Sequence, residues 1–500
     1  MRTASRPLVS VTLVLTAALD YVPTVNQWLM KPTRSWTLDP TEVYAERLNC
    51  RFVAACHPLV PGTALVPTST FAAKINMTSA RRAGKVVSRP AAISLRRVRA
   101  GLVLLLLAVG SLHPNLARST EKAPERLVAV GDVHADSEDF QLILKHTRLV
   151  DDQNHWIGGS ATLVQTGDLL DRGPKGREAM DLVIGLEKEA AAAGGKVVPL
   201  LGNHEVMNIL GDLRYVPPQN YASYADGESE KRRKAAYQEY AAWYTGHAKW
   251  LAAFKQTVLP ATEEEWMAKH PAGFVEYREA FGPKGNYGKW IRKHAALVKI
   301  GGVIFVHGGL DPNLVSIQLD QINSRIRGEL EDFDKMKQSL ESSNVILPFF
   351  TIQEIAVAVQ AKMLADRTTG TPSSAETHAM LERILSFNGW LCMRDDGPLW
   401  FRSYDQWSEE EGTPQVEKVL KAYDATHIVV AHTVQKAAHI RSRFGARVFL
   451  IDTGMLSTYW KGGKASALDI SADGKFTAQY LDGQEVLFDE KSPASGVKGN

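Results

Sequence analysis

The chain has 500 residues, of which 45% are hydrophobic and 23% are charged, and its formal net charge is +3. This composition is that of a globular protein with roughly three domains, or with one large domain and an extension. So small a net charge provides no electrostatic basis for a nucleic-acid partner, and we expect none. Of the three cysteines, Cys50, Cys56 and Cys392, only the last lies in the body of the chain, which excludes a disulfide framework or a cysteine-type zinc site there.

Two segments near the N-terminus resemble signal peptides. Residues 1–20 have a basic start followed by a short apolar run. Residues 101–112 form a stronger apolar run behind a flank of three arginines. This second run is too short for a comfortable membrane span, but it suits the apolar core of a signal peptide, and it would carry any membrane association of the protein. A buried core helix is the alternative interpretation.

A cleavable signal does not normally begin so far into a chain. We therefore expect translation to start at Met77 rather than Met1, and the protein to enter the secretory pathway or to be anchored on a lumenal membrane face. A bipartite targeting segment for an organelle such as the plastid is the alternative. In either case residues 1–120 are expected to be a targeting or artefactual extension, largely disordered, and residues 121–485 to form one folded domain.

Beyond residue 120, apolar runs alternate with helical patterns. Strands are predicted at Leu127–Val130, in "TLVQTGD" and in "KVVPLLGNHE", with helices in "SEDFQLILKHTRLV" and "GREAMDLVIGLEKEAAAAGG" between them. This β–α–β–α–β order predicts an α/β fold with a mainly parallel sheet and right-handed crossovers. Three more strands are predicted later, in "GGVIFVHGGLDP", "THIVVAHT" and "RVFLIDTG".

Two helical inserts interrupt this alternation, near residues 211–295 and 315–391. The first is rich in aromatic residues that recur near one helix face: Tyr237, Tyr240, Trp243 and Tyr244. Aromatic residues mixed with basic ones can stack on nucleic acid, but interspersed glutamates dilute the charge here, so an amphipathic cap is favoured. Both inserts are expected to form walls of a substrate cleft.

The C-terminal part of the domain ends with an expected edge hairpin. "FTAQYLDGQEVLF" alternates between apolar and polar residues, with Asp482–Gly483 as its turn. Residues 486–500 are expected to be a polar, disordered tail.

Polar side chains follow directly after the predicted strands, in the order Asp132, His134, Asp168, Asp171, Arg172, Asn203, His204, Glu205, His307 and His432. Taken singly, Asp132 or Asn203 would be a turn former and His432 a core histidine. In α/β sheets, however, loops at the carboxyl ends of strands converge on one crevice. Carboxylate, amide and imidazole donors suit divalent or trivalent first-row metals, so the joint pattern predicts a metal site.

The pattern resembles a known family. "GDVHAD", "GDLLDRG", "GNHE", "HGGL" and "AHT" are the blocks of the calcineurin-like metallophosphoesterases of the phosphoprotein phosphatase group, and the resemblance covers roughly residues 125–480. Within that group the chain looks most like the Shewanella-like protein phosphatases, because of "GNHEVMN", "DGPLWFRSY" and "FLIDTGM". It departs from the family at Ala135–Asp136, where glycine usually follows the histidine. The resemblance implies an α+β sandwich of mixed central sheets flanked by helices.

The resemblance also implies two metal ions, either two Mn or Fe with Zn. The first would be held by Asp132, His134 and Asp168. The second would be held by Asp168, Asn203, His307 and His432, with the Asp168 carboxylate bridging both. Such a pair lowers the pKa of a shared water, and the bridging hydroxide would attack phosphorus without a covalent enzyme intermediate.

The remaining roles implied by the resemblance concern the proton and the phosphate. His204 would protonate the leaving oxygen, and Asp171 would orient its ring. Arg172 would grip phosphate oxygens as a planar fork, alongside Asn203. A second phosphate-binding arginine is expected at Arg402, with Arg394 as the alternative. Both of these arginines could instead form surface ion pairs.

These expectations together describe an enzyme, a metal-dependent phosphatase that hydrolyses a phosphorylated protein or peptide. A nucleotide or diadenosine polyphosphate hydrolase is the alternative, because related folds share the same motifs. A non-catalytic binding protein is disfavoured, because no ligand position in the motifs is substituted.

Overall fold

The computed structural model describes residues 126–252, 260–369 and 373–491, all of which belong to one compact unit of the chain. The two signal-like segments, the expected start at Met77 and the remainder of residues 1–120 lie outside the described residues. In the part of the chain that the structure describes, no helix is both long and apolar enough to cross a membrane.

The first sheet has six strands in the order β11-β10-β9-β1-β2-β3. The strands are β1 (Arg126–Val130), β2 (Thr162–Gln165), β3 (Lys196–Pro199), β9 (Ser466–Ser471), β10 (Lys475–Tyr480) and β11 (Gly483–Asp489). Strands β1, β2 and β3 pair in parallel, with Val128 opposite Leu163 and Leu163 opposite Val197. The predicted parallel unit is therefore confirmed, and antiparallel pairing of β9 with β1 makes the sheet mixed.

The second sheet has five strands in the order β4-β5-β6-β8-β7. The strands are β4 (Leu297–Ile300), β5 (Val303–Val306), β6 (His427–Val430), β7 (Arg441–Arg443) and β8 (Val448–Leu450). Strands β5, β6 and β8 are the three predicted strands, and they pair in parallel. Strands β4 and β7, which the sequence pattern did not indicate, add antiparallel edges.

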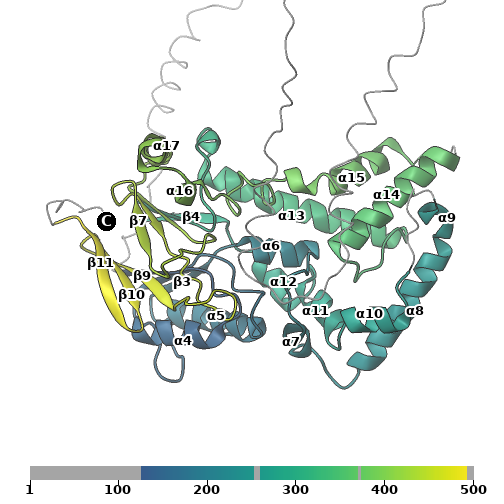
Figure 1. The fold of residues 1–500 in the computed structure, drawn as a ribbon, viewed down its shortest axis with the longest axis horizontal. Helices are drawn as coiled ribbons and strands as arrows, with labels where there is room; N and C mark the ends of the chain where they lie inside the picture. Colours follow the sequence, from purple (N-terminus) through teal and green to yellow (C-terminus); the bar gives the residue numbers. More distant parts are fainter. Residues whose placement is uncertain (1–125, 253–259, 370–372, 492–500) are drawn as a thin grey trace, which may run out of the picture. The chain divides into compact units, whose positions relative to one another are not determined.

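The two sheets pack face to face through alternate side chains. Ala129 and Val164 of the first sheet share a buried core with Phe305 and Phe449 of the second. The intervening residues, such as Val128, belong to another core, which includes helix side chains. Because successive side chains of a strand point to opposite faces, a strand buried along its whole length, such as β2 or β5, is covered on both sides. The fold is thus the expected sandwich of mixed sheets with helices outside (Figure 1).

Five helices in the described part of the chain belong to the fold outside the inserts. These helices are α4 (Ser137–His146), α5 (Gly176–Ala192), α6 (Asn203–Leu210), α16 (Ser403–Gln406) and α17 (Glu409–Ala422). Helix α4 buries the face that the sequence predicted, formed by Phe140, Ile143 and Leu144. Asp136 caps this helix by accepting a hydrogen bond from the backbone N–H of Asp139 at 3.1 Å, which gives a structural reason for the polar residue at the departure from the family pattern.

Both inserts are helical. The first contains α7 (Pro218–Ala222), α8 (Ser229–Gly246), α9 (Ala248–Leu251), α10 (Glu263–Lys269), α11 (Phe274–Phe281) and α12 (Asn286–Ile291). The second contains the 3-10 helices η1 (Pro312–Leu314) and η2 (Phe387–Gly389) and the α-helices α13 (Leu319–Ser342), α14 (Ile352–Thr369) and α15 (Ala375–Leu385). Helix α9 packs on α14, and α13 packs on α6, so the inserts touch each other and the helix that begins at Asn203 (Figure 1).

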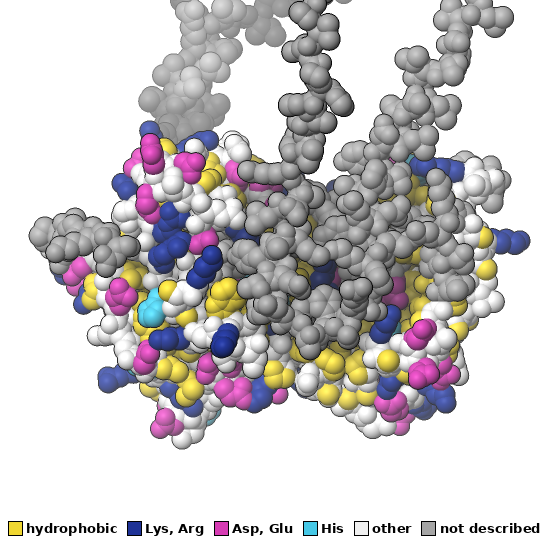
Figure 2. Space-filling view, viewed as in Figure 1, with side chains coloured by type: hydrophobic (Ala, Val, Ile, Leu, Met, Phe, Trp, Pro, Cys, Tyr) yellow, Lys and Arg dark blue, Asp and Glu magenta, His cyan; other side chains and the backbone are white. Residues whose placement is uncertain are grey.

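The aromatic residues of the first insert form its core. Tyr240 and Trp243 of α8 are buried, and Trp266 of α10 packs against Tyr240 with ring centroids 6.2 Å apart. Tyr237 and Tyr244 pack against the same core from half-buried positions. The packing interpretation of this aromatic helix is therefore confirmed. On the face that Figure 2 shows, acidic and basic side chains of the described residues are interspersed.

The C-terminal hairpin lies at the edge of the first sheet, as predicted, but its turn differs. Tyr480 pairs with Gly483, so the turn consists of Leu481 and Asp482 rather than Asp482–Gly483, because the backbone of Gly483 already belongs to the strand ladder. Strand β11 continues to Asp489, beyond the expected domain boundary at residue 485. Residues 492–500 of the expected tail lie outside the described residues.

Candidate active site

The predicted metal ligands meet at the carboxyl ends of β1, β2, β5 and β6 and at the start of α6. Each of these ligands is at most 6% exposed. They are Asp132, His134, Asp168, Asn203, His307 and His432. The structure therefore brings together residues that are far apart in the sequence. For example, the backbone N–H of His432 donates to Asp132 Oδ1 at 3.1 Å, across 300 positions.

Four of these side chains converge on one point. His307 Nε2 lies 2.9 Å from Asn203 Oδ1, 3.1 Å from His432 Nδ1 and 3.3 Å from Asp168 Oδ2. The other ring nitrogen of His307, Nδ1, is 3.0 Å from the backbone oxygen of Thr166 and can donate to it, which directs Nε2 to the cluster. This is the ligand set expected for the second metal.

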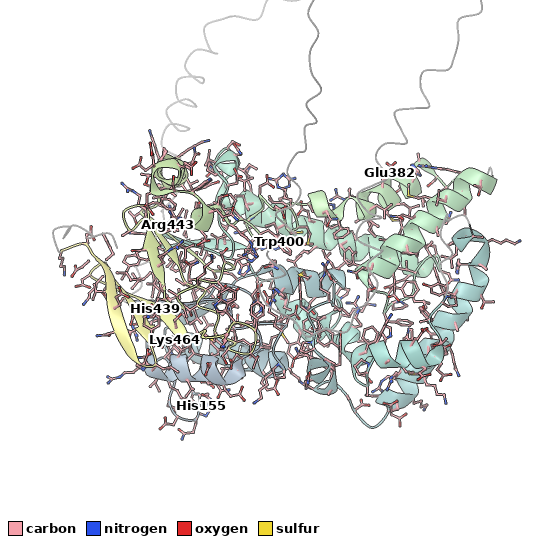
Figure 3. All side chains as sticks on the ribbon, in the orientation of Figure 1. His155, Glu382, Trp400, His439, Arg443 and Lys464 are labelled. Carbon is pink, nitrogen blue, oxygen red and sulfur yellow. The ribbon has the colours of Figure 1, made fainter. Side chains whose placement is uncertain are left out.

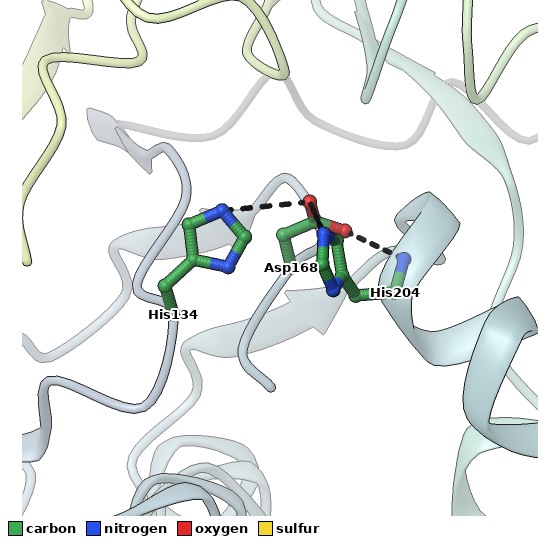
Figure 4. Close-up of side chains that lie close together, drawn as sticks. All are labelled: His134, Asp168 and His204. Carbon is green, nitrogen blue, oxygen red and sulfur yellow. Dashed lines mark hydrogen bonds and ion pairs between the residues drawn. The ribbon is translucent and has the colours of Figure 1, made fainter. Parts of the chain in front are cut away.

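The ligands expected for the first metal are arranged more loosely around the same carboxylate. His134 Nε2 lies 3.6 Å from Asp132 Oδ2 and 3.9 Å from Asp168 Oδ2. His134 Nδ1 is 3.1 Å from the carbonyl oxygen of Leu170, which fixes the ring in the same way as in His307. Figure 4 shows the Asp168 carboxylate between His134 and His204. Because Asp168 belongs to both groups, it is placed where a bridging ligand is needed.

The electrostatics of the cluster favour a bound cation. Burial, followed by the nearby charges of Asp452 and Asp168, raises the pKa of Asp132. Burial acts in the same direction on Asp168, but the imidazoles of His307 and His204 outweigh it and hold the pKa of Asp168 well below its usual range.

Two buried atoms beside these carboxylates, Asp452 Oδ2 and His432 Nε2, have no hydrogen-bond partner among the described residues. Buried carboxylates without enough donors are stable only when paired or metal-bound, so the donor set fits divalent metal ions.

The site loops hold an unusual backbone conformation. Five site residues have left-handed φ values: His134 (49°), Asp168 (56°), Asp171 (70°), Arg172 (67°) and His432 (65°). Each such residue costs roughly 1–2 kcal/mol relative to the right-handed region. Strain of this kind persists only where surrounding structure over-determines it, and it concentrates at functional sites.

Ala135, where glycine is usual in the family, shares the left-handed conformation with a φ of 61°. A hydrogen bond holds the loop here, because the Ala135 backbone N–H donates to the carbonyl oxygen of Leu169 at 2.8 Å. Alanine at this position therefore carries the strain of a left-handed φ, which glycine would not.

Glu205, quoted in the "GNHE" motif without a role, ties two of these loops together. Its carboxylate accepts hydrogen bonds from the backbone N–H groups of Asp168 and Gly202, both at 2.8 Å, and of Leu169 at 2.9 Å. A side chain at Gly202 would lie 2.1 Å from Asp168 Oδ1, so only glycine allows this approach. Burial, followed by the charge of Asp168, raises the pKa of Glu205 to about 7. Glu205 thus accepts from the N-cap backbone N–H of α6, as the glutamate of a capping box does, but Gly202 has no side chain to complete that motif, so the sequence offered no such signal.

The expected proton donor lies beside this cluster. His204 Nδ1 is 2.7 Å from Asp171 Oδ2, and His204 Nε2 is 3.8 Å from Asp168 Oδ2. The pairing of His204 with Asp171 is therefore present as the resemblance implied.

Arg172 is held by rings rather than by a carboxylate. Its guanidinium carbon lies 3.9 Å from the ring centre of Tyr459 and 4.7 Å from that of Tyr215. Its Nη2 is 3.4 Å from His204 Nε2, and its buried Nε has no hydrogen-bond partner among the described residues. A fixed fork of this kind with a free donor suits an oxyanion. The sequence pattern did not indicate the two tyrosines, because they come from separate loops.

The structure separates the two candidates for the second arginine. Arg402 Nη1 donates to the backbone oxygen of His432 at 2.9 Å and to Thr433 Oγ1 at 3.2 Å. Trp400, which is labelled in Figure 3, also contacts the His432 ring, with centroids 5.8 Å apart. Arg394 instead forms an ion pair with Asp396 at 2.8 Å. Arg402 is therefore placed at the site, and the described contacts of Arg394 are with its neighbouring acid.

Sequence reasoning assigned no role to Asp452, which is 1% exposed. It follows β8 directly in "FLIDTG", and one of its carboxylate oxygens accepts from the backbone N–H of Gly454 at 2.9 Å. The rule that found the other carboxylates, an aspartate directly after a buried strand, would have found this one too.

Comparisons with known proteins agree with the geometry. The model of the calcineurin-like phosphoesterase family matches residues 125–436, which include every expected metal ligand. Shewanella-like protein phosphatase 1 of Plasmodium berghei is 25% identical over 333 residues, which cover 66% of this chain and 67% of that protein. Shewanella-like protein phosphatase 2 of Arabidopsis thaliana is 33% identical over 222 residues, 42% of this chain and 53% of that protein.

Among solved structures, the cold-active protein tyrosine phosphatase of a psychrophilic Shewanella species is similar, with 23% identity and a TM-score of 0.46 over 73% of this chain and 80% of that one. The resemblance inferred from the motifs is confirmed by the family match, which extends over well more than half of the sequence. The chain belongs to the calcineurin-like phosphoesterase family.

Proposed function

We propose that the protein is a phosphatase that hydrolyses phosphate monoesters on proteins or peptides with the help of two metal ions. The observation that carries the proposal is the Arg172 guanidinium, which has a buried unpaired Nε and lies beside both His204 and the cluster around Asp168. A phosphate held there would contact the arginine, the proton donor and the metal ligands at once.

The proposed metal ligands are side chains that surround the Asp168 carboxylate. Asp132, His134 and Asp168 would hold one ion, and Asp168, Asn203, His307 and His432 would hold the other, with Mn, or Fe and Zn, as the metals. When bound, such a pair supplies a water of lowered pKa and neutralises charge on the phosphate oxygens.

The protein's own residues would orient the phosphate. The Arg172 fork presents donors to equatorial oxygens, and the faces of Tyr215 and Tyr459 keep it from turning away. Arg402, at the N-terminus of α16, would approach from the side of His432, because its side chain donates to the His432 carbonyl oxygen. Lysine could not reproduce either contact, since it lacks the planar, bidentate geometry.

His204 would donate a proton to the departing oxygen. Its Nδ1–H faces Asp171, so Nε2 is the atom directed to the substrate. The Asp171 carboxylate both selects this orientation and stabilises the protonated ring. The position of His204 Nε2, 3.4 Å from Arg172 Nη2, lets one phosphate group meet both side chains.

The names of the relatives support a phosphoprotein substrate, since the similar proteins of Plasmodium berghei and Arabidopsis thaliana are both called protein phosphatases.

The test is release of inorganic phosphate by the full chain, loaded with Mn²⁺ or with Fe and Zn. Its substrates are a panel of phosphoserine, phosphothreonine and phosphotyrosine peptides, compared with diadenosine polyphosphates. Turnover of the peptides is expected. Turnover of the dinucleotides alone would replace the proposal with a nucleotide polyphosphate hydrolase.

A further inference from the structure

We infer that Asn208 and Tyr277 are positioning residues for His204, and that they connect the first helical insert to the proton-donating pair. The inference rests on the proposed role of His204 as the proton donor. It concerns a hydrogen-bonded sequence of side chains that runs from Tyr277 through Asn208 and Asp171 to His204. All four residues are buried, with Asn208 and Asp171 fully enclosed.

The Asn208 side-chain amide donates hydrogen bonds to both Asp171 and His204. Its Nδ2 lies 3.0 Å from Asp171 Oδ1 and 3.1 Å from Asp171 Oδ2, and it also donates to the backbone oxygen of His204 at 2.9 Å. Asn208 lies one helical turn beyond His204 on α6, so the two side chains share a helix face. The amide therefore contacts both members of the pair and fixes the rotation of the Asp171 carboxylate.

The position of Tyr277 determines the direction of this hydrogen bonding. A carboxylate can only accept, so the NH₂ group of Asn208 must face Asp171 and its Oδ1 must face away. Tyr277 lies on that other side, with its hydroxyl 2.5 Å from Asn208 Oδ1. The hydroxyl is thus the donor, and it prevents the amide from flipping its oxygen toward the carboxylate.

Tyr277 is itself held rigidly by the insert. Its ring stacks on Phe281 with centroids 4.4 Å apart, and it packs edge to face against Tyr221 and Tyr224, both at 5.1 Å. The aromatic core of the insert thereby sets the position of one hydroxyl, and this hydroxyl sets the orientation of the amide and of Asp171. Because small misplacements of a catalytic group lower rates strongly, the packing of the insert would influence proton donation without contacting the substrate.

The chain offers a matched pair of variants for the test. Tyr277→Phe removes the hydroxyl that donates to Asn208 and keeps the ring. Tyr224→Phe removes a second buried hydroxyl from the same aromatic cluster, one that has no hydrogen-bond partner among the described residues. A general loss of packing would affect both variants, whereas the proposed connection affects only the first.

The readout is the dependence of turnover on the leaving group, measured on the full metal-loaded chain. Phenyl phosphate needs its leaving oxygen protonated, whereas p-nitrophenyl phosphate has a leaving group that departs readily without a proton. We expect Tyr277→Phe to lower kcat on phenyl phosphate about fivefold and on p-nitrophenyl phosphate less than about twofold, since one hydrogen bond is affected. KM and bound metal should stay unchanged, and Tyr224→Phe should behave as wild type. Asn208→Leu should repeat the pattern with a larger effect.

A double-variant cycle tests whether Tyr277 acts through His204. In a His204→Asn background, Tyr277→Phe should cause no further loss on phenyl phosphate. An equal loss in both backgrounds, or an equal loss on both substrates, would overturn the inference. If the single variant His204→Asn keeps the wild-type leaving-group dependence, the proton-donor role itself is wrong, and the inference falls with it. The two failures are told apart because the second is visible without any change at Tyr277.

Discussion

The strand-end loops and the helical inserts are both buried, but in opposite ways. The loops bury charge in a strained backbone, as Asp168 does with a φ of 56° and 1% exposure. The inserts bury aromatic rings in ordinary helices, such as α10, where Thr262 caps the helix and Trp266 is packed inside. Loops of this kind cost stability and provide chemistry, whereas inserts of this kind provide stability and shape. The comparison predicts that variants in the two regions will have separable effects on turnover and on unfolding.

The largest effect is expected at Asp168. Asp168→Asn removes the charge shared by both ligand groups, so turnover should fall by about a thousandfold or more. Despite its burial, the imidazoles of His307 and His204 hold the pKa of Asp168 well below its usual range, so its charge stabilises the metal-free protein, and the unfolding midpoint without metal should fall while the variant still folds. The measurements are kcat, bound metal and thermal unfolding with and without chelator.

Asp152→Asn, at an exposed aspartate, is the matched control and should leave all three quantities unchanged. A fully active Asp168→Asn protein would refute the two-metal assignment. A variant that loses turnover only because it no longer folds would contradict the separation between the two regions.

The opposite result is expected in the insert. Trp266 contacts Tyr237, His270 and other rings, and it is 1% exposed. Trp266→Ala should lower the free energy of unfolding by about 3–5 kcal/mol, the usual range for a buried tryptophan. At a temperature where the variant is still folded, kcat on p-nitrophenyl phosphate should remain within about twofold of wild type. Denaturant unfolding and kinetics on the same preparation check both statements. A large loss of kcat in the folded variant would show that the insert core and the site are not separable.

The same contrast explains what the sequence could predict. The ligand loops are local: an apolar run followed at once by Gly-Asp or Gly-Asn identifies Asp168 and Asn203, and the strand-end rule brings them together with His307. The link from Asn208 to Tyr277 joins residues 69 positions apart and depends on how α11 packs, so no pattern in the sequence indicates it. Strand β7 escaped prediction because its residues, "RSR", lack an apolar alternation and are ordered by pairing with β8.

The pH dependence of unfolding tests how much burial in the insert contributes to stability. The residue that reports on it is His294, near the end of the first insert. Burial lowers the pKa of His294 to about 3, and neither ring nitrogen has a hydrogen-bond partner among the described residues. The unfolded chain takes up a proton near pH 6.5 while the folded protein does not, so this residue's contribution is intact above pH 6.5 and is lost as the pH falls toward 3. The loss is at most about 1.4 kcal/mol per pH unit.

The variant His294→Leu removes this dependence and keeps an apolar side chain beside Trp290, whose ring centroid lies 4.3 Å from that of the histidine. Between pH 7 and pH 5 the wild type should lose up to about 2 kcal/mol of unfolding free energy relative to the variant. Other buried groups titrate alike in both proteins and cancel in the difference. Parallel pH dependences of the two proteins would show that the histidine is solvated or protonated when folded.

The smallest effect is expected from the two arginines, which test where the site ends. Arg402→Lys keeps the charge but loses the fork that reaches the His432 carbonyl, so KM for a phosphopeptide should rise about tenfold, as for loss of one charge-assisted hydrogen bond. Arg394→Lys should leave KM unchanged, because its partner is Asp396. Arg394→Lys should unfold at the wild-type temperature, and Arg402→Lys slightly below it, because the hydrogen bond to His432 is lost. If the two changes raise KM equally, the phosphate-binding surface extends from the strand-end loops to the segment before Trp400. In that case the strand-end loops would not be the only region that binds substrate, and the segment that follows the second insert would share this role.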